Sequence, residues 1–151
     1  MMKGQVSTEL LVIVALVLLV FIPLLVLVYF KANEANQQIA SYQAELAVFR
    51  LASLANSVGS LGTNTSVQTD VFIPPNTVEL KTTTSPTGRG GEISLRVMTP
   101  EGVTDITQIV KYPIKNPRPL ANETTAGGWM RLKVSSEYVD NEATIIIEKV
   151  S

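Results

Sequence analysis

The chain has 151 residues and a nearly balanced charge, with 12 Lys and Arg against 13 Asp and Glu, so its formal net charge is −1 at pH 7. No basic cluster points to nucleic-acid binding. Cys and His are both absent, which excludes disulfides, thiolate metal sites and catalysis by a histidine base. No P-loop, G-x-S-x-G or H-E-x-x-H motif occurs, so we expect neither an enzyme nor a cofactor.

An unbroken apolar run covers residues 10–30. In a helix, its about 21 residues are enough to cross the roughly 30 Å hydrocarbon core of a bilayer. Secretory h-regions are shorter, at about 7–15 residues. Tyr29 and Phe30 suit an aromatic belt at the outer interface. The run therefore predicts a membrane helix, with the N-terminus in the cytoplasm and the larger C-terminal part outside the cell.

Pro23 lies inside this apolar run. A proline removes one backbone donor and clashes with the preceding turn, so it predicts a kink or a local break. One interpretation is a tolerated membrane proline. The other is a bend needed for packing against neighbouring copies.

A short basic leader, ending in Lys3 and Gly4, precedes the sequence QVSTE at positions 5–9. The small residue stands before the apolar run, whereas the cleavage site of a secretory signal follows it. Cleavage after Gly4 would therefore leave the apolar helix on a mature chain that begins with Gln5.

Residues 5–9 resemble the Q-x-S-x-E start of archaeal type IV pilin-like proteins with class III signal peptides. The resemblance covers about residues 1–30, and nothing from residue 63 onward adds to it. It implies cleavage between Gly4 and Gln5 by a membrane prepilin peptidase, then assembly by a pilus platform and its ATPase. Archaellins have mature starts richer in Gly and Ala, so the resemblance favours an adhesive pilus over a swimming filament.

Glu9 is an acidic residue immediately before the apolar run. The resemblance implies that it meets the new amine of Gln5 on a neighbouring subunit. Glu9 lies one turn from Gln5, about 6 Å along a helix axis, so a neighbour shifted by one turn can present its amine to this carboxylate. The alternative is a first-turn acid in the headgroup layer, and cyclisation of Gln5 would remove the amine charge.

Residues 31–58 contain no Pro or Gly and are rich in Ala, Gln, Glu and Leu, which are good helix formers. We expect one helix from about residue 7 to residue 58, ended by the sequence GSLG at 59–62. An apolar stripe recurs at spacings of three and four: Ile39, Tyr42, Leu46 and Phe49, with Leu54 and Val58 beyond. We expect this stripe to pack on the chain's own C-terminal domain. Packing on other subunits is the alternative, and both can hold along different parts of the stripe.

The composition changes from residue 63, where Thr, Val and Ile alternate between Gly, Pro and Asn turns. This pattern predicts short antiparallel strands at 67–73, 78–84, 92–99, 103–112, 129–139 and 142–150, with residues 113–128 as a surface loop. The fold class is therefore α+β, a long helix followed by a small β-sandwich-like domain. The expected parts are a leader (1–4), an assembly helix (5–30), an amphipathic extension (31–62) and an extracellular β-domain (63–151).

Two sequons begin at Asn64 and Asn122, in predicted loops of the exported part. They are candidates for N-glycosylation. A calcium site at Asp140 and Glu142 is conceivable, but solvated surface carboxylates are the simpler interpretation. The glycines at 88–91 lie between two predicted strands and indicate a hairpin loop instead of a phosphate site.

The hypothesis from the sequence is a structural subunit of an extracellular, self-assembling pilus-like filament. Its expected partners are other copies of the chain, the prepilin peptidase, the assembly machinery and, before assembly, the membrane. The alternatives are a minor pilin and a membrane-anchored cell-surface binding module that does not polymerise.

Overall fold

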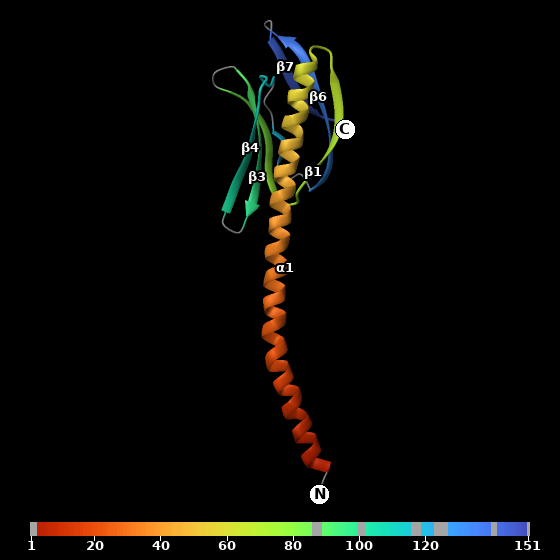
Figure 1. Ribbon diagram of the computed structural model, residues 1–151, viewed down its shortest axis with the longest axis vertical. Helices are drawn as coiled ribbons and strands as arrows, with labels where there is room; N and C mark the ends of the chain where they lie inside the picture. The colour runs from red at the N-terminus through yellow and green to blue at the C-terminus, as the bar shows by residue number, and fades with distance from the viewer. Residues whose placement is uncertain are drawn as a thin grey trace. The chain divides into compact units, whose positions relative to one another are not determined.

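The computed structural model describes residues 3–85, 89–99, 102–115, 119–122, 127–139 and 142–150. The chain forms two compact units, Met1–Gln38 and Ile39–Ser151. In the described residues, one helix is followed by seven strands (Figure 1).

Helix α1 spans Lys3–Leu61, 59 residues, slightly beyond the expected range at both ends. It ends where Gly62 adopts φ = 90°, a left-handed conformation that glycine tolerates and that commonly ends helices. The helix continues through Pro23, so the predicted local break is wrong. Because proline has no backbone N–H, the carbonyl of Leu19 lacks its helical donor four residues along the chain.

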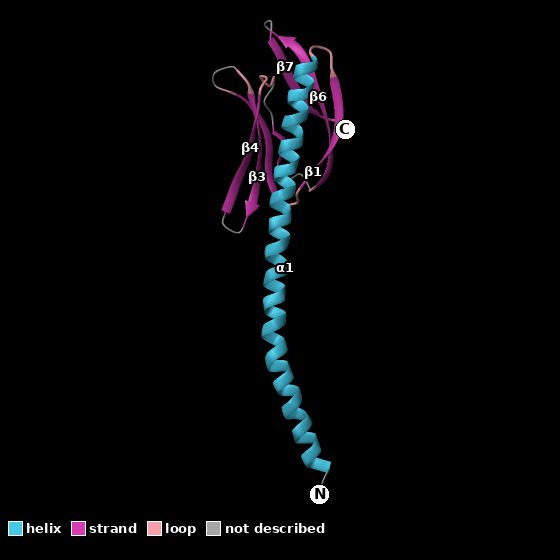
Figure 2. Ribbon diagram, viewed as in Figure 1, coloured by secondary structure: helices cyan, strands magenta, loops and turns pink. Residues whose placement is uncertain are grey.

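The strands form two antiparallel sheets (Figure 2). One sheet has the order β1-β6-β7, and the other has the order β4-β3-β2-β5. The strands span Ser66–Ile73 (β1), Thr77–Thr84 (β2), Gly91–Thr99 (β3), Gly102–Val110 (β4), Pro119–Asn122 (β5), Gly128–Val139 (β6) and Glu142–Lys149 (β7). The predicted α+β class, with a long helix before a small antiparallel β-domain, is confirmed.

The segment predicted to be a loop between residues 113 and 128 contains two paired pieces. The short strand β5 pairs with β2, and Ile114 forms a bridge with Ile145 of β7. The main-chain bond from the N–H of Lys115 to the carbonyl of Ile145 is 2.8 Å long. The loop prediction is therefore wrong in part, because this segment contributes to both sheets.

The C-terminal part of α1 and the inner faces of both sheets share one hydrophobic core. The helix contributes mostly small side chains, and the strands contribute larger aliphatic ones. The fully buried positions include Ala44, Val48, Leu51, Ala55, Val71, Leu80, Ile93, Leu95, Leu132, Val134 and Ile145. Alanines on the helix let strands from two sheets approach its backbone closely, since core packing fills the available volume.

The first four residues of the stripe predicted to pack on this domain do not do so. Ile39, Tyr42, Leu46 and Phe49 are 52–69% exposed. Successive helical residues are about 100° apart, which places these four side chains roughly opposite the alanine-rich face that includes Ala44 and Ala55. The expectation that the stripe covers the chain's own β-domain is therefore wrong for these four residues. It holds at the C-terminal end of the stripe, where Leu54 is half-buried and Val58 is buried.

Candidate functional site

The apolar run of the N-terminal unit exposes its side chains along the helix. Its large apolar side chains, from Leu10 to Phe30, are 46–70% exposed. An 18-residue stretch of this helix has a mean hydropathy of 3.5, and the helix is long and apolar enough to cross a membrane. Burial of such a surface requires lipid or other protein chains.

Glu9 lies on the surface of α1, beside Thr8, Val12 and Ile13, with which it lines a shallow hollow. None of the described cations lies within 4 Å of its carboxylate. Gly4 and Gln5 belong to the first turns of the same helix. Gln5 and Glu9 are thus separated by one helical turn, as the assembly hypothesis requires.

A polar boundary follows the apolar run. The ammonium of Lys31 lies 2.7 Å from a carboxylate oxygen of Glu34, three residues along the helix. Both side chains are solvent-exposed, so this ion pair contributes little to stability. It marks where the helix surface changes from apolar to polar.

The exposed stripe Ile39–Tyr42–Leu46–Phe49 is the main feature of the helix face turned away from the sheets. Toward the C-terminus the same face continues with the exposed Ser53, Ser57 and Ser60. Ser57 donates to the carbonyl of Ser53 at 2.9 Å, and Ser60 donates to that of Ser57 at 2.8 Å. Both hydroxyls already donate a hydrogen bond within the helix. Removing this face from water therefore costs less free energy than it would with unpaired hydroxyls.

A shallow groove of about 420 Å³ lies between this serine face and strand β4. Gln108 and Ile109 form its wall on β4, and Ile109 is largely exposed. The side-chain oxygen of Asn56 accepts a 2.8 Å hydrogen bond from the backbone N–H of Lys111, which ties the helix to the end of β4. This groove extends the exposed surface beside the stripe.

A second groove of about 330 Å³ lies on the other flank of the helix. Gln43, Leu46 and Arg50 form its helical side, and Phe72 and Trp129 form its sheet side. Leu46 thus belongs both to the exposed stripe and to this groove. The sequence did not indicate the groove, because its walls come from three distant segments.

The ionic contacts of the sheets are structural. The Nε atom of Arg131 lies 2.9 Å from Oδ1 of Asp70, and Nε of Arg96 lies 2.8 Å from Oδ1 of Asp105. Each ion pair joins two neighbouring strands. The hydrogen bond from Arg131 lowers the pKa of Asp70, and Arg96 lowers the pKa of Asp105 in the same way. The described residues contain no group of three His, Cys, Asp or Glu that could hold a metal ion.

The two sequons have different settings. Asn64 is exposed and has φ = 61°, a left-handed conformation that asparagine tolerates, and its N–H donates to the carbonyl of Ser136 at 3.1 Å. Asn122 lies at the end of β5, opposite Glu79, and not in a loop. The rest of its sequon lies outside the described residues.

The remaining candidates concern turns. Glu142 begins β7, whereas Asp140 lies outside the described residues, so the interpretation of both as solvated surface carboxylates stays a prediction. Ser85 donates its N–H to the carbonyl of Gly90 at 3.1 Å, and β2 and β3 pair up to Gly91. The glycine-rich segment therefore connects a β-hairpin, as predicted, although Gly88 itself lies outside the described residues.

No known protein-family model matches the chain, and no similar curated protein or solved structure was found.

Proposed function

We propose that this chain is a structural subunit of an extracellular type IV pilus-like filament. After a prepilin peptidase removes residues 1–4, an assembly platform and its ATPase transfer the apolar helix from the membrane into a filament of identical subunits. The β-domain faces outward and serves surface attachment.

The observation that carries this proposal is the exposed stripe Ile39–Tyr42–Leu46–Phe49. A permanently anchored module would need only the apolar run within the bilayer. Here bulky apolar side chains continue along the helix beyond the polar pair Lys31–Glu34, where lipid no longer covers them. Packing of other helices on both segments buries these side chains. The free energy gained is about 25 cal/mol per Å² of apolar area removed from water.

The two apolar segments contribute in different ways. The run at residues 10–30 leaves lipid and not water, so its association depends on close packing and polar pairing. The stripe leaves water, so it gains the full hydrophobic term. A head-to-tail contact that does not close then produces an open filament.

Glu9 would set the stagger of neighbouring helices. Its carboxylate is costly in an apolar surrounding, and pairing with the amine of a neighbouring Gln5 compensates it only at one axial position. A buried ion pair that selects one register is a well-attested role for such groups.

The test is a pair of variants in the native host, Gly4→Val and Glu9→Ala. We expect Gly4→Val to retain the leader and Glu9→Ala to be cleaved normally, with neither forming filaments in the sheared extracellular fraction. Glu34→Ala is the matched control, because it removes a carboxylate of the same helix outside the apolar run. Normal filaments from the Glu9→Ala protein would contradict the role of Glu9.

A membrane-anchored binding module that never polymerises is the second candidate. The groove beside Trp129 is the observation that favours it. An intact leader in the membrane-bound protein, with no chain in the extracellular fraction, would support this alternative.

A further inference from the structure

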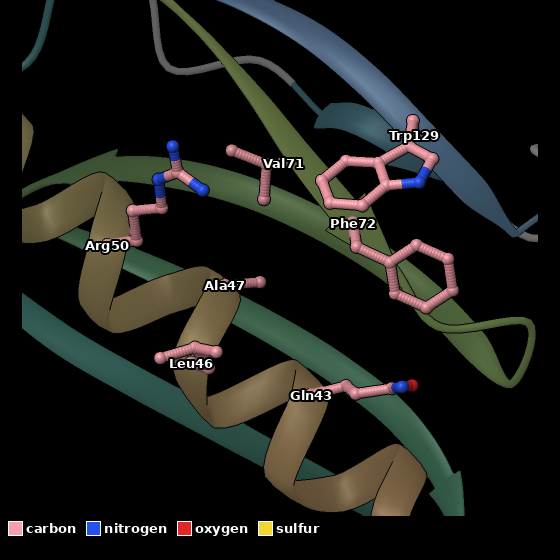
Figure 3. Close-up of a pocket in the computed structure, with 7 residues that line it drawn as sticks. All are labelled: Gln43, Leu46, Ala47, Arg50, Val71, Phe72 and Trp129. Atoms are coloured by element: carbon pink, nitrogen blue, oxygen red, sulfur yellow. The ribbon is translucent and has the colours of Figure 1, made fainter.

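The groove beside Trp129 has the shape of a small binding site. It holds about 330 Å³, within the usual range for small-molecule sites. In Figure 3 the buried Ala47 projects from the helix and the buried Val71 from β1, and the Trp129 indole lies on the sheet side. The groove is thus an apolar floor bordered by polar and aromatic side chains.

Its aromatic wall is exposed to solvent and contacts one other ring. Trp129 is 72% exposed, and its ring meets that of Phe72 edge-to-face, with centroids 5.5 Å apart. The preceding Gly128 has φ = 149°, a value that strongly favours glycine, and a Cβ on Gly127 would lie 2.4 Å from the Cα of Pro75. Both positions therefore require glycine in the backbone before Trp129, and the exposed indole is accessible to a ligand.

Its helical wall carries a cation without an ionic partner. Among the described residues, no carboxylate lies within 4 Å of the Arg50 guanidinium. Asp70 is engaged by Arg131 at 2.9 Å, although the charge of Arg50 also lowers the pKa of Asp70 slightly. Gln43 adds an amide two turns away, about 10 Å along the helix, at the other end of the groove.

We propose that this groove binds an acidic saccharide, with a uronate-type sugar ring stacked on Trp129 and its carboxylate paired with Arg50. The C–H groups of a pyranose face match the apolar, electron-rich face of an indole. The fork of donors on arginine matches a carboxylate. Gln43 can both donate to and accept from hydroxyls of the adjoining sugar. The inference goes beyond filament formation and holds for an anchored module as well.

Other occupants fit less well. An inorganic anion has no use for the indole and the apolar floor. An uncharged chain would make no use of the exposed Arg50 guanidinium. The acidic sugar uses the cation, the amide and the aromatic wall together.

The test exploits Trp129 as the only tryptophan of the chain, so its fluorescence reports directly on the groove. The full chain in detergent is titrated with tetragalacturonate and, separately, with its fully methyl-esterified form, which keeps the rings but lacks the charges. We expect a saturable change with tetragalacturonate and at least tenfold weaker binding of the ester. Arg50→Gln should remove this difference, whereas Lys111→Gln, which neutralises an exposed lysine that does not line the groove, should preserve it.

Replacing Trp129 removes the fluorescence signal, so a second measurement uses calorimetry. Trp129→Ala should abolish tetragalacturonate binding in calorimetry, and Tyr138→Ala, which removes another exposed aromatic of β6, should leave it unchanged. Circular dichroism of each variant verifies folding. The absence of a saturable response, equal binding of the ester, or an equal response to acetate would overturn the proposal. Filament formation by the same variants is measured separately. The result of the binding experiment therefore neither supports nor contradicts the proposed function.

Discussion

Leu46 and Leu51 are five residues apart on α1 and have opposite surroundings. Leu46 is 66% exposed, whereas Leu51 is completely buried against the sheets. Five residues correspond to about 140° around the helix, so the same side-chain type covers the core at one position and faces outward at the other. The helix therefore has one apolar face that packs on its own domain and a second that is exposed; in the proposed filament, other chains cover the second face.

The first prediction compares Leu46→Ala with Leu51→Ala. We expect Leu51→Ala to lower the free energy of unfolding of the domain by about 2–5 kcal/mol, because it opens a cavity in the core. Leu46→Ala should change it by less than about 0.5 kcal/mol. In cells, however, Leu46→Ala should reduce filament yield. Denaturation of the full chain in detergent and electron microscopy of sheared fractions measure the two effects. Equal destabilisation by the two substitutions would contradict the assigned faces.

The second prediction concerns Gly59, near the end of α1. A Cβ at this position would lie 2.2 Å from Cδ2 of Tyr112, deep in the ring and not at its flexible end. Gly59→Ala should therefore destabilise the domain by about 1–3 kcal/mol through overpacking. In the double variant with Tyr112→Ala, the two costs should be clearly less than additive. Ser60→Ala, on the exposed side, is the control and should have little effect; strict additivity of the double variant would refute the contact.

The third prediction is a pH dependence. Because Arg131 lowers the pKa of Asp70 in the folded chain, the stabilisation from this pair is present above the unfolded pKa of about 3.9 and is lost as pH falls through the folded value. An NMR titration of the Asp70 carboxyl should give a midpoint below about 3.9. Arg131→Gln should raise that midpoint more than Arg50→Gln does, since Arg50 acts only through its charge. An unchanged midpoint in Arg131→Gln would rule out the pair in solution.

The fourth prediction concerns the sequon at Asn64. Its exposure and its position in a turn make it accessible to a glycosyltransferase. Ser66→Ala should remove one glycan mass from the exported chain while it keeps Asn64, whose left-handed backbone conformation the turn uses. Intact-protein mass spectrometry decides the point; identical masses for the wild type and Ser66→Ala would show that this sequon is not used.

Much of the fold follows from local patterns. Helical composition without Pro or Gly predicted α1 beyond the membrane run, and alternation between turns predicted six strands. Strand β5 escaped prediction because it has only four residues, begins with Pro119 and pairs at a sheet edge. Its pairing with β2 is a tertiary contact, which the local sequence does not specify.

The exposed stripe shows why burial was predicted incorrectly. Large apolar residues normally mark the core face of a helix, and Ile39, Tyr42, Leu46 and Phe49 fit that rule by spacing. The true core face, with Ala44, Ala47, Val48, Leu51 and Ala55, has the same period but smaller side chains. Which face the sheets cover depends on how closely they approach the helix, and periodicity does not contain that information.

The Trp129 groove could not be predicted from the sequence for a different reason. Phe72 and Trp129 are 57 positions apart and become neighbours only through the antiparallel register of β1 and β6, in which they are paired. Arg50 joins them from the helix. The only local signal in the sequence was a single tryptophan after two glycines.

The most direct test of the central claim is the N-terminal mass of the chain recovered from sheared extracellular material. The proposed function predicts a mature chain that begins at Gln5, or at its cyclised form, within filaments. A chain that retains Met1 or Met2 and occurs only in membranes would contradict it.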